Sequence, residues 1–110
     1  MPDPGARLPT HIEVGALLRR VQQEGGFATV LAKGEADAGT ILVVLMDRNS
    51  PARAYERMPQ MDGSRAWTLS REAAIDDPHA FSEWLDRRCA QDADLWIIEL
   101  DIPQGERFIG

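Results

Sequence analysis

Apolar residues near the start of the chain recur at the spacing of one helix face. They are Val14, Leu17, Leu18 and Val21. Positions i, i+3, i+4 and i+7 lie on the same side of an α-helix. Thr10 followed by Glu13 matches a capping box with Thr10 as the N-cap, and two glycines, Gly25 and Gly26, end the pattern. The sequence therefore predicts a helix over residues 11–24.

Four short runs typical of β-strands follow this helix, and the second of them is rich in β-branched residues. They cover residues 27–32, 40–46, 52–58 and 65–70. The turn-forming sequences DRNSP and PQMDGS separate the last three runs. Since these connections are too short for parallel crossovers, we expect the four strands to form an antiparallel meander.

A second helix is predicted nearer the C-terminus. Asp77 is an N-cap residue, and Pro78 occupies the first helical position. Helical spacing then recurs at Phe81, Trp84, Leu85 and Cys89. The pattern predicts a helix over residues 78–90 with the cysteine on its buried face as an unreactive thiol. A strand over residues 95–102 follows, with a short pairing expected at residues 107–109.

The order helix, four strands, helix, strand indicates an α+β fold with a mainly antiparallel sheet of four or five strands. We expect a single domain over residues 10–110, preceded by a disordered tail over residues 1–9. The strand at residues 40–46 is apolar on both faces, so both faces of the sheet need a cover. Either the two helices lie on opposite faces, or both lie on one face and a partner chain covers the other.

Composition and charge exclude several classes of function. The 110 residues are 44% hydrophobic and 27% charged, which is typical of one globular domain. The net charge of -6 argues against DNA or RNA as the main ligand, because nucleic-acid affinity depends on cationic contacts with phosphates. The longest apolar run, residues 41–46, is too short to cross a membrane, and no signal-peptide pattern is visible. A single cysteine fits a reducing cytoplasm, so we expect a cytoplasmic protein without nucleic-acid or membrane partners.

The sequence GEADAGT, residues 34–40, has the glycine spacing of a phosphate-binding loop but lacks its lysine. Glu35 and Asp37 would repel a phosphate, and strands are predicted on both sides where such a loop needs a following helix. We therefore expect a hairpin turn whose glycines adopt positive φ, with no nucleotide and no other cofactor.

Six carboxylates are the candidate ligand-binding residues. They are Glu35, Asp37, Asp92, Asp94, Glu99 and Asp101. Glu99 and Asp101 are two positions apart in a strand, so their side chains point the same way with Cα atoms about 6.7 Å apart. Such a pair suits acid–base chemistry, although solvated acids at the end of a strand are the simpler interpretation. His11 and His79 have no histidine or cysteine partner at ligand spacing, so no metal site is predicted.

Three residues share one side of the strand predicted over residues 52–58. They are Arg53, Tyr55 and Arg57. Arginine and aromatic side chains are enriched among the residues that dominate protein interfaces, so these three are the candidate interaction residues.

Two stretches of the chain, residues 15–43 and 92–101, carry a family resemblance. They contain Gly-Gly-Phe, then Lys-Gly-acid-x-x-Ala-Gly, and later Asp-x-Asp-Leu-Trp. The matching residues are Gly25, Gly26, Phe27, Lys33, Gly34, Glu35, Ala38, Gly39, Asp92, Asp94, Leu95 and Trp96. The pattern resembles the family of small bacterial proteins called domain of unknown function 1491. This resemblance implies no known activity, catalytic residue or cofactor.

Two functions stay open on the sequence. The first, which we favour, is a non-catalytic protein-interaction or regulatory domain that binds a partner protein or forms a homodimer. The alternative is a small-molecule-binding or hydrolytic domain that uses carboxylates near the end of the sheet. An exposed apolar surface would favour the first function, and a pocket lined by carboxylates with raised pKa values would favour the second.

Overall fold

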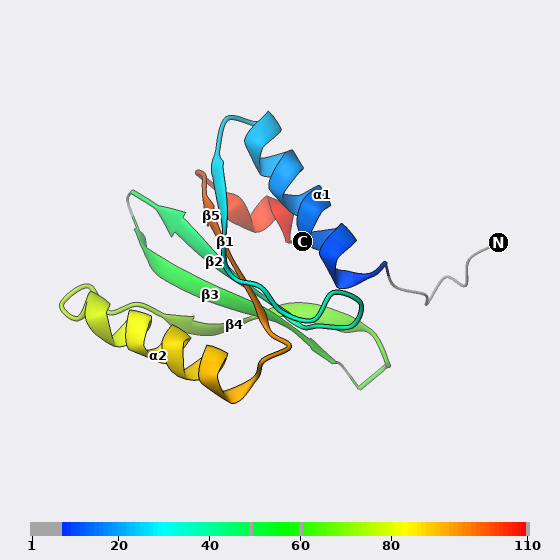
Figure 1. The fold of residues 1–110 in the computed structure, drawn as a ribbon. Helices are drawn as coiled ribbons and strands as arrows, with labels where there is room; N and C mark the ends of the chain where they lie inside the picture. Colours follow the sequence, from blue (N-terminus) through cyan, green and yellow to red (C-terminus); the bar gives the residue numbers. More distant parts are fainter. Residues whose placement is uncertain (1–7, 49, 60, 110) are drawn as a thin grey trace.

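A five-stranded sheet lies between two helices in the computed structural model (Figure 1). The structure describes residues 8–48, 50–59 and 61–109. In chain order the elements are α1 (Thr10–Gln23), β1 (Phe27–Ala32), β2 (Ile41–Asp47), β3 (Ser50–Pro59), β4 (Arg65–Glu72), α2 (Pro78–Gln91), β5 (Trp96–Asp101) and the 3-10 helix η1 (Gly105–Phe108). The predicted α+β class and element order are confirmed, and both helices lie within one residue of their predicted bounds. Most of the predicted tail falls outside the described residues.

The strands are ordered β1-β5-β2-β3-β4 across the sheet. β2, β3 and β4 form an antiparallel meander as expected. β5 enters between β1 and β2, antiparallel to the first and parallel to the second. The predicted pairing of the first two strands, and with it the hairpin at residues 34–40, is therefore wrong. The physical reason is that β5 carries apolar side chains on both faces, and both can be buried only inside the sheet.

The two helices cover opposite faces of the sheet (Figure 1). On the α1 face, which η1 also covers, the buried core consists of Val14, Leu17, Val21, Ile41, Val43, Leu45, Trp96, Ile98, Leu100, Ile102, Phe108 and Ile109. On the α2 face it consists of Leu42, Val44, Ala54, Phe81, Leu95 and Ile97. Successive residues of β2 and β5 alternate between the two cores, as strand geometry requires. A partner chain is thus not needed to cover a bare face. Neither helix of the described chain is long and apolar enough to cross a membrane.

The start of α1 differs from the predicted capping box. Thr10 is the first residue of the helix, and the N-cap is Pro9, which makes no capping bond through its side chain. Glu13 bonds to Arg57 of β3 at 2.8 Å and not to the helix backbone. The end of the helix follows the prediction, because Gly25 has a φ of 86°, a left-handed conformation that favours glycine.

The start of α2 is as predicted. The side chain of Asp77 accepts a hydrogen bond of 3.2 Å from the N–H of Ala80, and Pro78 is the first helical residue. Cys89 is half-buried on the face of α2 that packs against the sheet, as its spacing predicted. In place of the pairing predicted at residues 107–109, η1 forms a turn of 3-10 helix.

An ion pair fastens α2 to the sheet. Glu56 of β3 is 6% exposed and accepts two hydrogen bonds of 2.6 Å from the guanidinium of Arg88. The hydroxyl of Ser70 donates a third bond, also of 2.6 Å. The bonds from Arg88, together with that from Ser70, hold the pKa of Glu56 below its ordinary value against the opposing effect of burial. The guanidinium groups of Arg71 and Arg88 both lie over the ring of Trp84.

Candidate functional site

The segment Gly34–Gly39, here called the capping loop, joins β1 to β2 and contacts the start of β5. A Cβ atom on either of its two glycines would lie well within 3.0 Å of the carbonyl oxygen of Asp94. Neither Gly34 nor Gly39 has a positive φ. Among the described residues, the glycines with a positive φ are Gly25 and Gly63. The predicted positive φ is therefore wrong. The loop requires glycine because the backbone of β5 leaves no room for a side chain.

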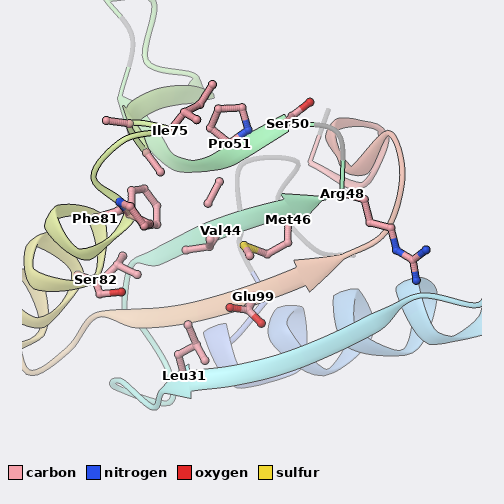
Figure 2. A pocket seen from close by; sticks show the side chains of 15 residues that line it. Leu31, Val44, Met46, Arg48, Ser50, Pro51, Ile75, Phe81, Ser82 and Glu99 are labelled. Atoms are coloured by element: carbon pink, nitrogen blue, oxygen red, sulfur yellow. The ribbon is translucent and has the colours of Figure 1, made fainter.

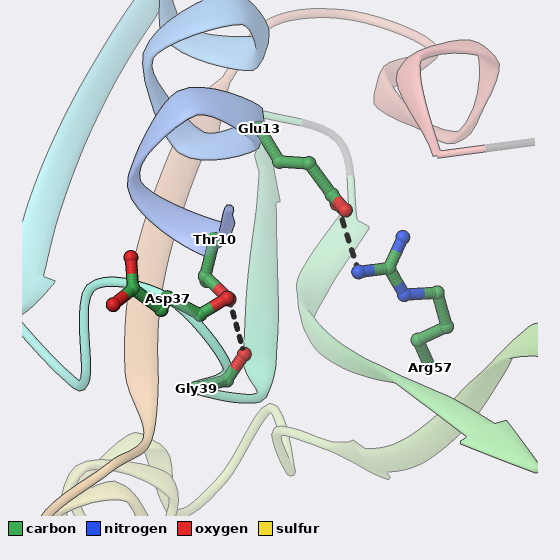
Figure 3. Close-up of polar contacts among 5 residues, drawn as sticks. All are labelled: Thr10, Glu13, Asp37, Gly39 and Arg57. Atoms are coloured by element: carbon green, nitrogen blue, oxygen red, sulfur yellow. Dashed lines mark hydrogen bonds and ion pairs between the residues drawn. The ribbon is translucent and has the colours of Figure 1, made fainter. Parts of the chain in front are cut away.

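Carbonyl groups of the capping loop accept hydrogen bonds from the first residues of α1. The N–H of Thr10 donates to the carbonyl of Asp37 at 3.2 Å, and the N–H of His11 donates to that of Ala36 at 2.9 Å. The hydroxyl of Thr10 donates to the carbonyl of Gly39 at 2.8 Å (Figure 3). The loop thus provides the cap that the first N–H groups of a helix need and that the N-cap side chain does not provide.

The loop also bonds to itself and to β5. The indole N–H of Trp96 donates to the carbonyl of Glu35 at 2.7 Å, and the N–H of Glu35 donates to the carbonyl of Asp94 at 3.1 Å. The carboxylate of Glu35 accepts bonds from the N–H groups of Asp37 and Ala38 at 2.9 and 2.5 Å. In a phosphate-binding loop such N–H groups point at the anion, whereas here they point at protein oxygens.

We expect ATP to leave the stability of the protein unchanged. The N–H groups of Thr10 and His11, which a helix would offer to a phosphate, are bonded to the capping loop, and Glu35 and Asp37 would repel the anion. The melting temperature should be the same with and without millimolar ATP and magnesium. A rise in the melting temperature on addition of ATP would contradict this expectation.

The six candidate carboxylates form two groups. The group at the start of β5 consists of Glu35, Asp37, Asp92 and Asp94. Glu99 and Asp101 lie farther along β5 and share its α2 face, as predicted. An extended strand from Asp94 to Asp101 spans about 23 Å, so the groups do not meet in one site. In the part of the chain that the structure describes, no three His, Cys, Asp or Glu side chains are grouped to hold a metal ion. Ligand binding by either group stays a prediction.

The three candidate interaction residues lie half-buried on the α1 face of β3. Arg57 bonds to Glu13 of α1 at 2.8 Å (Figure 3), and Arg53 pairs with Glu106 of η1. Arg53 also lies 3.4 Å from the hydroxyl of Tyr55. These contacts connect β3 to α1 and η1, so a partner would have to compete with internal ion pairs for the arginines.

An open apolar groove beside α2, with a volume of about 590 Å³, is a feature that the sequence did not predict. Val44 and Met46 of β2 lie at its centre, with Phe81 of α2 on one side and Leu31 of β1 on the other (Figure 2). Short side chains such as that of Ala52 leave the space between β3 and α2 unfilled. The signal in the sequence was the series of alanines on and after the strands that face α2.

The surroundings of the groove are more acidic than basic. Glu99 and Arg48 line it, and Arg48 also lines a neighbouring hollow together with Asp47 and Asp101. Ile75, which is 87% exposed, belongs to the rim beside α2 and is followed in the sequence by two aspartates. A ligand with positive charge beside an apolar part would complement this arrangement.

The chain matches one family model and several solved structures. The model, described as "Protein of unknown function (DUF1491)", matches residues 8–110. The crystal structure of a DUF1491 family protein from Caulobacter crescentus CB15 is 38% identical, with a TM-score of 0.78 over 93% of this chain and 94% of that one. An NMR structure of a DUF1491 family protein from the same bacterium is 34% identical, with a TM-score of 0.79 over 96% and 94%. The solution structure of a protein from A. tumefaciens is 30% identical, with a TM-score of 0.75 over 94% and 93%.

No curated protein matches the chain. The family model covers nearly all of the described residues, and the similar structures cover more than nine-tenths of both chains. This chain therefore belongs to the DUF1491 family of proteins of unknown function.

Proposed function

We propose that this protein is a non-catalytic interaction domain that holds a segment of a partner protein in the apolar groove. The observation that carries the proposal is the groove itself, in which Val44, Met46, Leu31 and Phe81 surround a space open to solvent (Figure 2). Small-molecule sites usually enclose most of the ligand surface, whereas an open groove suits a polypeptide segment that lies across it. Exposed apolar surface of this kind commonly marks interaction sites.

The charges beside the groove support a basic partner. Glu99 lies on its wall, and Asp47 and Asp101 lie in the hollow that shares Arg48 with it. The whole chain carries a net charge of -6. Complementary charges bring partners together and fix their orientation. The segment that fits best has apolar side chains flanked by lysine or arginine.

A small-molecule-binding or hydrolytic domain is the second candidate. The observation in its favour is the volume of about 590 Å³, within the range of about 300–1,000 Å³ that small-molecule sites occupy. Glu99, with Asp101 two residues away on the same face, would supply the carboxylates. The open shape of the groove, which would leave much of a small ligand exposed, makes this candidate second.

We also propose that the protein is cytoplasmic and that it associates with itself. The chain has a single cysteine, Cys89, and so cannot form an internal disulfide that would need an oxidising compartment. Self-association does not follow from a bare sheet face, because α1 and α2 cover both faces. It is supported instead by the exposed strand β1 at the edge of the sheet.

Selection from a peptide library tests the groove directly. Random-sequence peptides are selected on the wild type and measured against Ser82→Trp, in which a large side chain on α2 blocks the groove. Ala90→Trp, exposed on the same helix but outside the groove, is the matched control. We expect apolar peptides with basic flanks to bind the wild type and the control alike, and to bind Ser82→Trp at least about tenfold more weakly.

Two results would count against this proposal. Peptides that bind Ser82→Trp as well as the wild type would show that they bind elsewhere, and a library without any enriched peptide would leave the groove without the proposed ligand. A panel of metabolites that stabilises the wild type but not Ser82→Trp would favour the small-molecule candidate. Glu99→Gln measures the contribution of charge. It should weaken the binding of basic peptides severalfold and leave the binding of neutral peptides unchanged.

A further inference from the structure

β1 is an edge strand of the sheet and carries no charged residue. Its sequence is FATVLA, and Phe27, Val30 and Leu31 are 73%, 38% and 47% exposed. An unpaired strand edge is a template for another strand, so soluble proteins usually protect it with charged side chains, prolines or a covering element. The protection that β1 carries is a bulge between Val30 and Ala32, near its end.

The opposite edge of the same sheet is protected by charge. β4 has the sequence RAWTLSRE, with Arg65, Arg71 and Glu72 among its eight residues. Charged side chains along an edge oppose the approach of a second strand. The difference between the two edges indicates that β1, and not β4, pairs with another strand.

The sequence of β1 is complementary to a second copy of itself. When two β1 strands run antiparallel about a two-fold axis at Thr29, Phe27 of each copy lies opposite Leu31 of the other. Both residues face the α2 side of the sheet, because Phe27 pairs with Asp101, which lies on that face, and Leu31 lines the apolar groove. On the α1 side, Ala28 of each copy lies opposite Val30 of the other. These contacts are apolar and each occurs twice, and Thr29 lies opposite its own copy at the axis.

We propose that the protein forms a homodimer in which the β1 strands of two copies pair antiparallel and join two five-stranded sheets into one. This inference rests on the self-association that we propose above. Phe27 of the second copy lies beside Leu31 at the side of the apolar groove, so the dimer extends the wall of that groove. Because each strand has six residues, the contact is smaller than the interface of about 1,200 Å² typical of stable complexes, so the dimer should form only at high protein concentration.

Neither α1 nor the nearby charges prevent this pairing. Val30 faces the α1 side, opposite Ile98, yet stays 38% exposed, so α1 does not cover the outer edge of β1. Glu99 and Asp101 lie one strand inward, on β5. The two copies of β5 are three strand spacings apart in the dimer, about 14 Å, which exceeds the Debye length of about 8 Å at physiological salt. Since both chains carry a charge of -6, added salt should strengthen the dimer.

Sedimentation of the full chain, from micromolar to half-millimolar concentration, measures the dimer. Thr29→Lys places two ammonium groups at the two-fold axis and should weaken dimerisation at least about tenfold. Thr68→Lys makes the same change at an exposed position of the other edge strand, β4, and should leave dimerisation unchanged. Both threonines are exposed, so both variants should melt near the wild-type temperature, which confirms that each is folded.

A cysteine at the axis tests the register. In a Cys89→Ala background, Thr29→Cys should give a disulfide-linked dimer on mild oxidation, since opposite residues of an antiparallel pair have Cβ atoms about 4.5–5.5 Å apart. Thr68→Cys in the same background should stay mainly monomeric.

The possible results distinguish pairing through β1 from self-association through any other surface. A dimer that survives Thr29→Lys would overturn the β1 pairing and leave self-association through another surface. A chain that stays monomeric at half-millimolar concentration and high salt would overturn both. Peptide binding in the groove is measured separately with Ser82→Trp, so its failure is distinguishable from either result.

Discussion

Replacing Gly34 with alanine should lower the free energy of unfolding by about 3 kcal/mol. A Cβ atom there would lie well within 3.0 Å of the carbonyl oxygen of Asp94 and of the carbonyl carbon of Leu95. Both are backbone atoms at the start of a central strand, so the capping loop has to move instead. Its bonds to Thr10 and Trp96 would then lengthen or break. One methyl group therefore weakens the attachment of both α1 and β5.

Gly15→Ala is the matched control for this change. Gly15 lies within α1, and a Cβ atom at this position has no neighbour within 4 Å. Alanine is the better helix former, so the free energy of unfolding should rise by about 0.5–1 kcal/mol. Urea unfolding followed by circular dichroism measures both variants. Equal free energies of unfolding for the two would show that the capping loop adapts to a side chain, against the packing described here.

The start of α1 shows what local sequence patterns leave out. Thr10 and Glu13 have the spacing of a capping box, which predicts bonds within one turn of helix. In the structure Thr10 bonds to Asp37, 27 residues away, and Glu13 bonds to Arg57, 44 residues away. Spacing rules describe the isolated helix, so a cap supplied by a distant loop is invisible to them. The same rules succeeded at Asp77, where the partner is three residues away.

Two sequence features gave conflicting indications of the strand order. The short link between residues 27–32 and 40–46 favoured a hairpin, because neighbours in sequence usually pair. Residues 95–102 are apolar on both sides, and a strand buried on both faces belongs in the interior of a sheet. That requirement outweighs the short link, so β5 separates β1 from β2.

The candidate site could be predicted only where it depended on strand alternation. Glu99 and Asp101 share one face of β5 as expected, because two positions along a strand always do. The apolar groove depends on how far the side chains of α2 reach towards Ala52 and Met46, which is a matter of packing in three dimensions. Hydrophobic periodicity identifies the face that is buried, but it does not show where that burial is incomplete.

Removing the carboxylate of Glu56 should lower the free energy of unfolding by as much as Gly34→Ala does. Glu56→Ala leaves the guanidinium of Arg88, whose side chain is 26% exposed, without the two bonds of 2.6 Å that hold it. Breaking a buried ion pair from one side destabilises a protein by about 3–5 kcal/mol, and the partial exposure of Arg88 puts the expected loss near 3 kcal/mol. Glu24→Ala, the control, breaks an exposed pair with Arg107 and should change the free energy of unfolding by less than about 1 kcal/mol.

A second variant, Glu56→Gln, removes only the charge of this side chain. The free energy of unfolding that it loses relative to the wild type should depend on pH. Hydrogen bonds from Arg88 hold the pKa of Glu56 below its ordinary value of 4.5 in the folded protein, whereas the unfolded chain has no such bonds. The carboxylate therefore stabilises the fold fully above about pH 4.5, and this contribution is lost as the pH falls towards the folded-state pKa. Urea unfolding of the wild type and of Glu56→Gln should show a constant difference in stability near neutral pH and a difference that shrinks as the pH falls below about 5. A difference that is the same across this range would mean that Glu56 supports α2 through packing and neutral hydrogen bonds, and not through its charge.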